Sequence, residues 1–390
     1  MNASAKSFRS IGLLCAAAIS LLWTSLAWPG IAAAAPAAPV THAKATAVID
    51  VTSGRILFSD HGDDRMLIAS LTKIMTAIVA IEHGKLKDVV KISSRAAGVE
   101  GSSIYLKAGE KMTLQDLLYG LMLRSGNDAA TAIAEHVGGS VDGFAYLMNR
   151  KAEEIGLTNS HFVNPSGLDH KDHYSSANDL AKLTAYAMHN DTFREIVKTK
   201  EKKADGRDYE WLNKNKMLRF YEGADGVKTG YTKQALRCLV SSATRYGQQI
   251  VVVTLNDGDD WADHQRLLDY GFANYPLQEV VGSDEGVAGY PFRTASAFRY
   301  PFAAGERDQV RIHLTPYASG GVDYALGYRG KLTFRLDGQT LGSVLLLPQA
   351  AKDSAGQTPE APTMAEPSPA PHLTFAEALR RSIRFVLSFG

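Results

Sequence analysis

The sequence predicts an α+β fold in which an antiparallel sheet joins early and late strands of one long region. Apolar runs flanking short turns predict one hairpin at residues 45–59 and another at residues 238–255. Between these hairpins, apolar residues recur at helical spacing over several segments. Strands at both ends with helices between them favour an antiparallel sheet covered by helices.

The composition is that of an ordinary globular protein. The chain has 390 residues, of which 45% are hydrophobic and 21% are charged, enough for a sizeable core. The formal net charge is +1. Nucleic-acid binding normally needs a concentrated basic face, so we expect no nucleic-acid partner.

Residues 1–35 are predicted to be a secretory signal peptide. Lys6 and Arg9 make a basic start, residues 11–28 are almost entirely apolar, and the alanines at 32–35 supply small residues for cleavage. A membrane anchor is the alternative, because the apolar run approaches the length that spans a bilayer. Cleavage predicts an exported protein.

Cysteine usage also depends on that cleavage. Cys15 lies within the apolar run and would leave with the peptide, so Cys238 becomes the only cysteine of the mature chain. An intramolecular disulfide is then impossible. We interpret Cys238 as a buried strand residue.

The elements between the hairpins follow in order. Helical spacing predicts helices at residues 70–81, 113–124, 127–137, 141–155, 176–188 and 261–272. Two of these begin with capping pairs, Thr113 with Asp116 and Ser176 with Asp179. Residues 164–169 predict a turn-rich loop.

The C-terminal part changes character. Gly and Pro punctuate short β-rich runs over residues 276–350, which predicts a small all-β domain. Residues 351–371 are rich in Ala and Pro and predict an extended linker. Residues 372–390 predict an amphipathic helix whose three arginines face away from a wide apolar surface. We expect this helix to lie on a membrane, the alternative being a helix packed on its own protein.

Ser70 and Lys73 are a candidate nucleophile and base. On a helix, side chains at positions i and i+3 share a face, so the hydroxyl and the amine can meet. Ser70 would lie at the helix start, where the helix dipole favours developing negative charge. Lysine can accept the hydroxyl proton only if burial or a second cation lowers its pKa, and Lys228 is the candidate cation. The alternative is an ordinary capped helix.

Two further motifs accompany this pair. Ser125-Gly126-Asn127 falls between two predicted helices, where it could be rigidly held or could simply cap the second helix. Lys228-Thr229-Gly230 precedes a predicted strand. A strand edge with lysine and threonine donors suits a substrate carboxylate, and Gly230 would let substrate backbone approach closely. The alternative is a surface turn.

The three motifs, in this order, resemble those of the low-molecular-mass penicillin-binding proteins that act as serine D-alanyl-D-alanine carboxypeptidases, peptidase S11. The likeness extends to residues 63–76, 161–168 and 225–232. It implies that residues 36–275 form a catalytic domain with the penicillin-binding protein/β-lactamase-like transpeptidase fold. It also implies a location at the outer face of the cytoplasmic membrane or in the cell wall. Residues 256–264 resemble a sporulation-associated branch.

The resemblance assigns the reaction steps to the motif residues. Ser70 attacks the carbonyl between two terminal D-alanines of a peptidoglycan stem peptide, and Lys73 accepts its proton. Ser125 relays a proton to the leaving amine. Water then releases the shortened peptide, whereas a β-lactam would acylate Ser70 and leave slowly. This chemistry uses no cofactor and no metal.

The remaining motif residues are assigned to substrate binding. The resemblance implies that Asn127 hydrogen-bonds the substrate backbone and that Lys228 and Thr229 hold its terminal carboxylate. The backbone N–H groups of Ser70 and Tyr231 would form the oxyanion hole. Some relatives carry an Ala-Gly pair where this chain has Ala235-Leu236-Arg237, and the Arg237 side chain is a further candidate for the carboxylate.

Three other functions remain as alternatives. A class A β-lactamase needs a glutamate that activates the deacylating water, but Glu153 and Glu154 fall on a predicted helix, outside the 164–169 loop. A penicillin-binding sensor or scaffold would need a membrane segment coupled to a cytoplasmic domain. A metal site is conceivable where Asp169-His170 and Asp172-His173 lie close in sequence, although no third ligand motif matches them.

Overall fold

The computed structural model describes residues 37–349. The predicted signal peptide at 1–35, linker at 351–371 and terminal helix at 372–390 therefore lie outside the described residues. Within residues 37–349, no helix is both long and apolar enough to cross a membrane.

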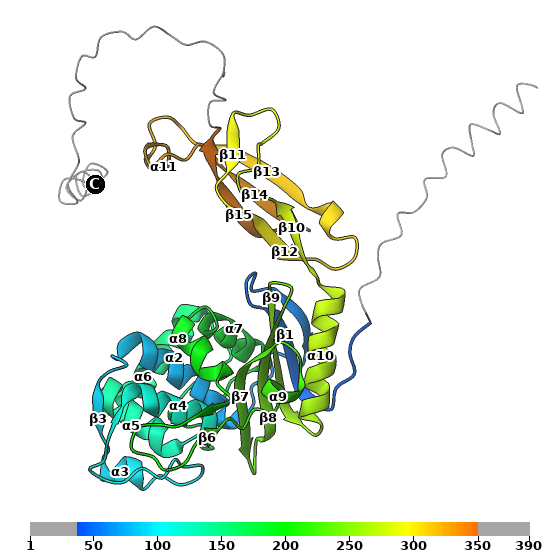
Figure 1. Ribbon diagram of the computed structural model, residues 1–390. Helices are drawn as coiled ribbons and strands as arrows, with labels where there is room; N and C mark the ends of the chain where they lie inside the picture. Colours follow the sequence, from blue (N-terminus) through cyan, green and yellow to red (C-terminus); the bar gives the residue numbers. More distant parts are fainter. Residues whose placement is uncertain (1–36, 350–390) are drawn as a thin grey trace, which may run out of the picture. The chain divides into compact units, whose positions relative to one another are not determined.

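A five-stranded antiparallel sheet organises the first part of the described chain (Figure 1). Its strands are β1 (Ala43–Asp50), β2 (Ile56–Asp60), β7 (Ala224–Thr232), β8 (Leu236–Arg245) and β9 (Gln248–Asp257). Their order is β2-β1-β9-β8-β7, so the first strand pairs with the last. The predicted sheet of early and late strands is therefore confirmed, and β7 forms one of its edges.

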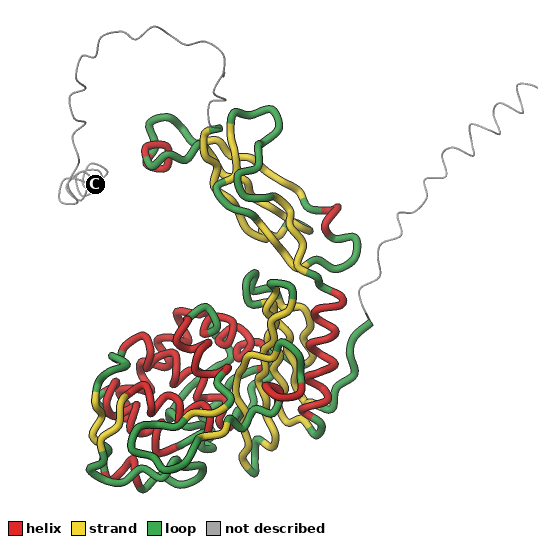
Figure 2. Tube along the Cα trace, in the orientation of Figure 1, coloured by secondary structure: helices red, strands yellow, loops and turns green. Residues whose placement is uncertain are grey.

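Helices cover both faces of this sheet (Figure 2). On one face lie α2 (Lys73–His83), α4 (Leu114–Arg124), α5 (Asn127–Gly138), α6 (Val141–Ile155), α7 (Ala177–Ala187) and α8 (Asp191–Lys198). On the other lie α9 (Met217–Phe220) and α10 (Asp260–Asn274). Successive side chains of a strand point to opposite faces. Accordingly, Val251 and Val253 of β9 join the first core, whereas Ile250 and Val252 join the second.

The helix starts follow the predicted caps, with one correction. Thr113 accepts a hydrogen bond from the Asp116 N–H, and Ser176 accepts one from the Asp179 N–H. The helix predicted over 70–81 instead begins as a 3₁₀ turn, η1 (Ala69–Thr72), which leads into α2. The nucleophile candidate thus lies on a tight turn just before the helix.

Short elements also occur that the sequence did not predict. They are β3 (Val89–Lys91), α3 (Ser94–Ala97), β4 (Lys111–Thr113), β5 (Glu201–Lys202) and β6 (Trp211–Leu212), together with α8 and α9. The two strand pairs are β3 with β4 and β5 with β6.

The chain after Tyr275 is built mainly of strands, in two sheets. One contains β10 (Leu277–Val281) and β12 (Phe298–Pro301). The other has the order β11-β15-β14-β13 and contains β11 (Phe292–Thr294), β13 (Arg311–Pro316), β14 (Gly330–Leu336) and β15 (Gln339–Pro348). Single turns η2 (Arg307–Gln309) and α11 (Val322–Ala325) interrupt them. Residues 276–349 are rich in strands, as the sequence predicts, while the separation of residues 276–350 as a domain stays a prediction.

Candidate active site

Ser70 lies in a cavity of about 460 Å³ where η1 meets β7 and the turn between α4 and α5. Ala69, immediately before it, has a positive φ of 46°, so the serine is presented on a sharp backbone bend. The cavity is lined by Ser70, Ser102, Ser125, Lys214, Thr229, Gly230, Tyr231, Arg237, Cys238, Asp260 and Trp261.

The Lys73 amine touches the nucleophile candidate directly. Its Nζ is 3.0 Å from Ser70 Oγ, 2.8 Å from Asn127 Oδ1 and 2.5 Å from the Ser166 carbonyl oxygen. A neutral amine keeps two N–H groups, which Asn127 and Ser166 can accept. The nitrogen lone pair is then left for the hydroxyl proton of Ser70.

Burial makes that neutral form accessible. Lys73 is fully buried, and loss of hydration lowers its pKa from 10.5 to about 7. The positive charge of Lys214 lowers the pKa further, whereas Asp128 opposes the change. A lysine with this pKa is half deprotonated near neutral pH and can act as a general base.

Asn127 orients the base from the first turn of α5. Besides accepting from Lys73, its amide donates through Nδ2 to the Glu100 carbonyl at 2.7 Å. The side chain is 5% exposed, so both amide ends are fixed by protein contacts. Its predicted contact with substrate backbone stays a prediction, but its contact with Lys73 was not foreseen.

The loop at 164–168 supplies the third acceptor through backbone. Asn164 Oδ1 accepts from the N–H groups of Ser166 and Gly167, and its Nδ2 donates to the Leu168 carbonyl. Gly167 has φ +83°, and a Cβ there would lie 1.8 Å from the Ala69 carbonyl oxygen. Glycine is therefore required where this loop packs on the nucleophile's turn. A carbonyl contact has no side-chain signature, so the sequence did not reveal it.

Ser125 lies in the cavity at the end of α4. It is 4% exposed and has a left-handed backbone, with φ 66°. The N-cap position of α5 is Gly126, without a side-chain cap bond, so helix capping does not explain the motif. The predicted position between two helices is correct.

The Lys228 motif lies on the edge strand β7, against η1. Lys228 is 1% exposed and donates to the Thr229 carbonyl oxygen at 2.8 Å. Burial, with the charges of Lys73 and Lys214, holds its pKa well below the usual value. A Cβ at Gly230 would lie 3.2 Å from the Ser70 nitrogen, so the missing side chain lets the strand approach the nucleophile.

Comparison with known proteins identifies the family. A sequence profile described as D-alanyl-D-alanine carboxypeptidase, peptidase S11, matches residues 32–259. This chain belongs to that family. The predicted resemblance is confirmed, and the β-lactamase and sensor alternatives are not favoured.

Curated relatives cover most of the catalytic region. The carboxypeptidase DacF of Bacillus subtilis is 35% identical over 258 residues, which are 63% of this chain and 66% of DacF. A carboxypeptidase of Streptomyces sp. strain K15 is 35% identical over 66% of this chain and 98% of its own length. DacA of Escherichia coli is 37% identical over 61% of this chain and 62% of its own length. The match thus spans somewhat less than two thirds of DacF and DacA.

Solved structures extend the likeness to the β-rich part. Penicillin-binding protein 5 from Haemophilus influenzae superposes with a TM-score of 0.67 at 27% identity, covering 80% of this chain and 98% of that protein. A carboxypeptidase DacD from Francisella tularensis gives a TM-score of 0.62 at 26% identity, with 80% and 94% coverage. The predicted α+β fold with antiparallel sheet and helices agrees with these family members.

The cavity contains residues that sequence reasoning passed over. Lys214, which donates to Ser102 at 3.2 Å, is the cation that lowers the Lys73 pKa, whereas the sequence had suggested Lys228 for this role. Arg237, already a candidate, does lie in the cavity, and its Nε donates to the Asp257 carbonyl oxygen at 3.2 Å. Asp260 and Trp261 also line the cavity. A lysine and a serine in turn-rich segments gave no periodic signal that could have marked them.

Two other reactive side chains of this chain, Cys238 and His173, are excluded as the nucleophile or the base. Cys238 is 1% exposed, and burial raises its pKa to about 12, so it stays a thiol. Its interpretation as a core strand residue is confirmed. His173 has its pKa lowered to about 4, chiefly by burial, and its Nε2 is 2.7 Å from Thr72 Oγ1. The imidazole therefore supports the turn without contacting Ser70.

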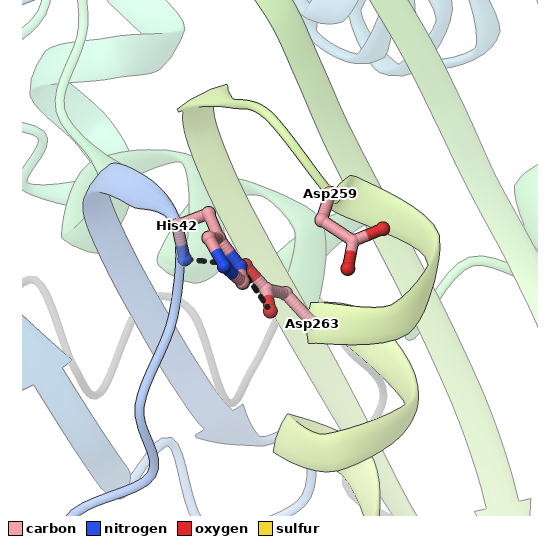
Figure 3. Close-up of side chains that lie close together, drawn as sticks. All are labelled: His42, Asp259 and Asp263. Atoms are coloured by element: carbon pink, nitrogen blue, oxygen red, sulfur yellow. Dashed lines mark hydrogen bonds and ion pairs between the residues drawn. The ribbon is translucent and has the colours of Figure 1, made fainter.

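The residues considered for a metal have other partners. Asp169 Oδ1 accepts from Thr232, and His173 faces Thr72. A different group, His42, Asp259 and Asp263, brings ligand atoms within 4.8 Å (Figure 3). The Asp263 carboxylate already accepts from the His42 N–H at 2.6 Å and pairs with Arg266. Protein groups thus balance its charge, and we interpret the cluster as a brace between the chain before β1 and α10.

Proposed function

We propose that this protein is a serine D-Ala-D-Ala carboxypeptidase that removes the terminal D-alanine from peptidoglycan stem pentapeptides. The contact between Lys73 Nζ and Ser70 Oγ carries the proposal, because two further acceptors can take both N–H groups of the neutral amine and leave its lone pair for the hydroxyl proton. The lowered pKa of Lys73 supports its role as base.

Acylation follows from this arrangement. Ser70 Oγ attacks the carbonyl carbon between the two D-alanines while its proton passes to Lys73 Nζ. The oxyanion is stabilised by the N–H groups of Ser70 and Tyr231, each donor contributing ~3–4 kcal/mol. Ser125 relays a proton to the leaving nitrogen, the C–N bond breaks, and D-alanine departs. The peptide is left as an ester on Ser70.

Substrate binding and deacylation use the rest of the cavity. Thr229 and Arg237 line the cavity and provide donors for the terminal carboxylate of the substrate. Lys228 is buried beside Thr229 on the same strand and supports this carboxylate site from behind the cavity wall. Water, giving a proton to Lys73, then attacks the ester and frees Ser70. A β-lactam forms the same ester, but its leaving group stays attached, so the acyl-enzyme persists.

We also propose where the reaction takes place. The signal peptide at 1–35 would export the protein, and the helix at 372–390 would hold it at the outer face of the cytoplasmic membrane, beside the wall. The 36–275 catalytic region and the 276–350 β-rich region would then act as separate domains joined to that helix by residues 351–371. A role in sporulation rests on the likeness of residues 256–264 alone.

The decisive assay measures D-alanine release from a pentapeptide ending in D-Ala-D-Ala. The mature protein should release D-alanine, and Ser70→Ala should not. Ser94→Ala, an exposed serine of α3 outside the cavity, is the matched control and should match the unmodified protein. Rapid penicillin turnover without D-alanine release would instead establish a β-lactamase.

A further inference from the structure

The four-stranded sheet of the β-rich region has one apolar and one basic face. On the inner side Phe334 is fully buried and stacks on Phe298 of β12, with ring centroids 4.3 Å apart. Strand alternation places the neighbouring residues on the outer side. These outer residues of β13 and β14 are Arg311, His313, Thr315, Lys331, Thr333 and Arg335.

The outer face carries uncompensated positive charge. Arg311 lies directly opposite Arg335 in the strand register, an arrangement that like-charge repulsion disfavours. Among the described residues, Arg311, Lys331 and Arg335 form no ion pair with a carboxylate. Arg293 lies on β11, at the opposite edge of the sheet, and is paired with Asp284, so it adds no unpaired charge. Such a face attracts an anionic partner.

An apolar loop lies at one end of this sheet. Residues 317–329 join β13 to β14 and contain Val322, 77% exposed, and Leu326, 68% exposed. The Leu326 N–H donates to the Val322 carbonyl oxygen at 2.9 Å, so one turn brings the two side chains to the same side. Two adjacent exposed aliphatic side chains favour contact with an apolar phase.

The chain leaves the sheet at the same end. The Arg329 N–H at the base of the loop donates to the Leu346 carbonyl oxygen at 2.7 Å, two residues before β15 ends at Pro348. Lys331 is the second residue of β14. The apolar loop, the Lys331 end of β14 and the end of β15 are therefore neighbours.

We propose that the outer face of this sheet, together with the apolar loop at one of its ends, is a second membrane contact, independent of the terminal helix. Lys331 lies near the loop, and the Arg311–Arg335 pair lies at the opposite end of the same face. Val322 and Leu326 enter the interface of an anionic phospholipid bilayer, and the basic outer face lies over the phosphate groups. A soluble polyanion would satisfy the charges but would offer no apolar phase to the loop. The combination therefore favours a lipid surface.

The test places an environment-sensitive dye in the loop of the full mature chain. A nitrobenzoxadiazole label at Leu326→Cys is compared with one at Tyr146→Cys, a side chain of α6 that is 65% exposed. The thiol of Cys238 is buried and protected in the folded protein. With vesicles of equal phosphatidylglycerol and phosphatidylcholine, the label at 326 should shift to the blue and brighten several-fold, while the label at 146 should not.

Charge variants test the basic face with the same dye. Replacing Arg311, Lys331 and Arg335 by serine should remove most of the change at position 326. The matched control replaces Lys85, Lys87 and Lys91, exposed lysines of the catalytic region, and should keep it. Circular dichroism spectra and thermal unfolding of every variant verify the fold, including that of the β-rich region.

The position of the label also distinguishes membrane contact by the loop from membrane binding by the terminal helix. If the protein sediments with anionic vesicles while the dye at 326 stays in water, the loop contact is wrong. An equal response with pure phosphatidylcholine would reject the role of the charges. A third outcome is that soluble polyphosphate binds the basic face tightly while vesicles leave the dye signal unchanged. This outcome would identify a polyanion site and overturn the lipid proposal.

Discussion

Lys73 sets the pH range in which Ser70 can react. Its pKa is lowered to about 7 because the amine is fully buried, with Lys214 adding to the effect. Only the deprotonated amine can take the serine proton. The second-order rate constant of penicillin acylation should therefore rise about tenfold per pH unit below pH 7 and level off above it. A rate that is flat from pH 5 to pH 9 would contradict this assignment.

Replacing Lys73 separates catalysis from stability. Lys73→Met should lower the acylation rate by at least ~10²-fold, the range expected for a lost general base. The same change should raise Tm, because a buried amine is replaced by an apolar chain of similar length. Normal penicillin labelling of the variant would reject Lys73 as the base.

The stability difference should depend on pH in a defined direction. The folded pKa of Lys73 is about 7 and the ordinary value is 10.5, so the unfolded chain binds more protons between these values. The unmodified protein therefore gains stability relative to Lys73→Met as pH rises from about 7 toward 10.5. Chemical unfolding at several pH values measures the change, and a gap that widens with pH would be inconsistent with it.

Gly167 is a second residue whose role, close backbone packing against η1, can be tested by one substitution. Gly167→Ala combines a positive φ with a Cβ that would lie 1.8 Å from the Ala69 carbonyl oxygen. We expect a loss of about 2–4 kcal/mol in unfolding free energy and much weaker acylation. Gly109→Ala has a similar φ of +80° but nothing within 4 Å, so it should cost only about 1–2 kcal/mol and keep acylation. Equal effects would show that crowding at η1 is unimportant.

At the scale of elements, Arg55 links the β1–β2 turn to the segment after β12. Its guanidinium donates to both carboxylate oxygens of Glu306 and to the Pro301 carbonyl, each at 2.7 Å. It also lies 5.0 Å and 5.4 Å from the ring centroids of Tyr275 and Tyr300. One side chain thus joins several segments distant in sequence.

Arg55→Ala should lower the free energy of unfolding by about 1–3 kcal/mol, since charged hydrogen bonds are lost in a half-buried setting. Arg150→Ala is the matched control, because its pair with Glu153 is exposed and should contribute about 0–1 kcal/mol. Urea titrations compare them. A loss no larger than that of the control would show that Arg55 is dispensable.

Elements with long periodic patterns could be predicted from sequence, whereas short ones could not. Apolar spacing located α4, α6 and α7, and side-chain caps marked the starts of α4 and α7. The strand pairs β3–β4 and β5–β6 have three and two residues per strand, too few for alternation to be visible. The site was likewise predictable only where a sequence pattern marked it. Side-chain motifs located Ser70 and Lys73, but the Ser166 carbonyl depends on a loop geometry that packing alone determines.

At the scale of the whole molecule, attachment and catalysis should be separable. Deleting residues 372–390 should release most of the protein from the membrane fraction while D-alanine release persists, because among the described residues the cavity is lined by positions between Ser70 and Trp261. Fractionation followed by penicillin labelling of both fractions measures this. A truncated protein that stays wholly with the membrane pellet would count against the terminal helix as the main anchor.

The acceptors around Lys73 have a practical consequence for the molecule as a whole. These acceptors come from α5 and the 164–168 loop and meet Ser70 of η1 only when the chain has folded. An unfolded chain still has the serine and the lysine, but it lacks the constraints that make them react. A fluorescent penicillin should therefore count native molecules, so its incorporation along a refolding time course would report recovery of the fold molecule by molecule.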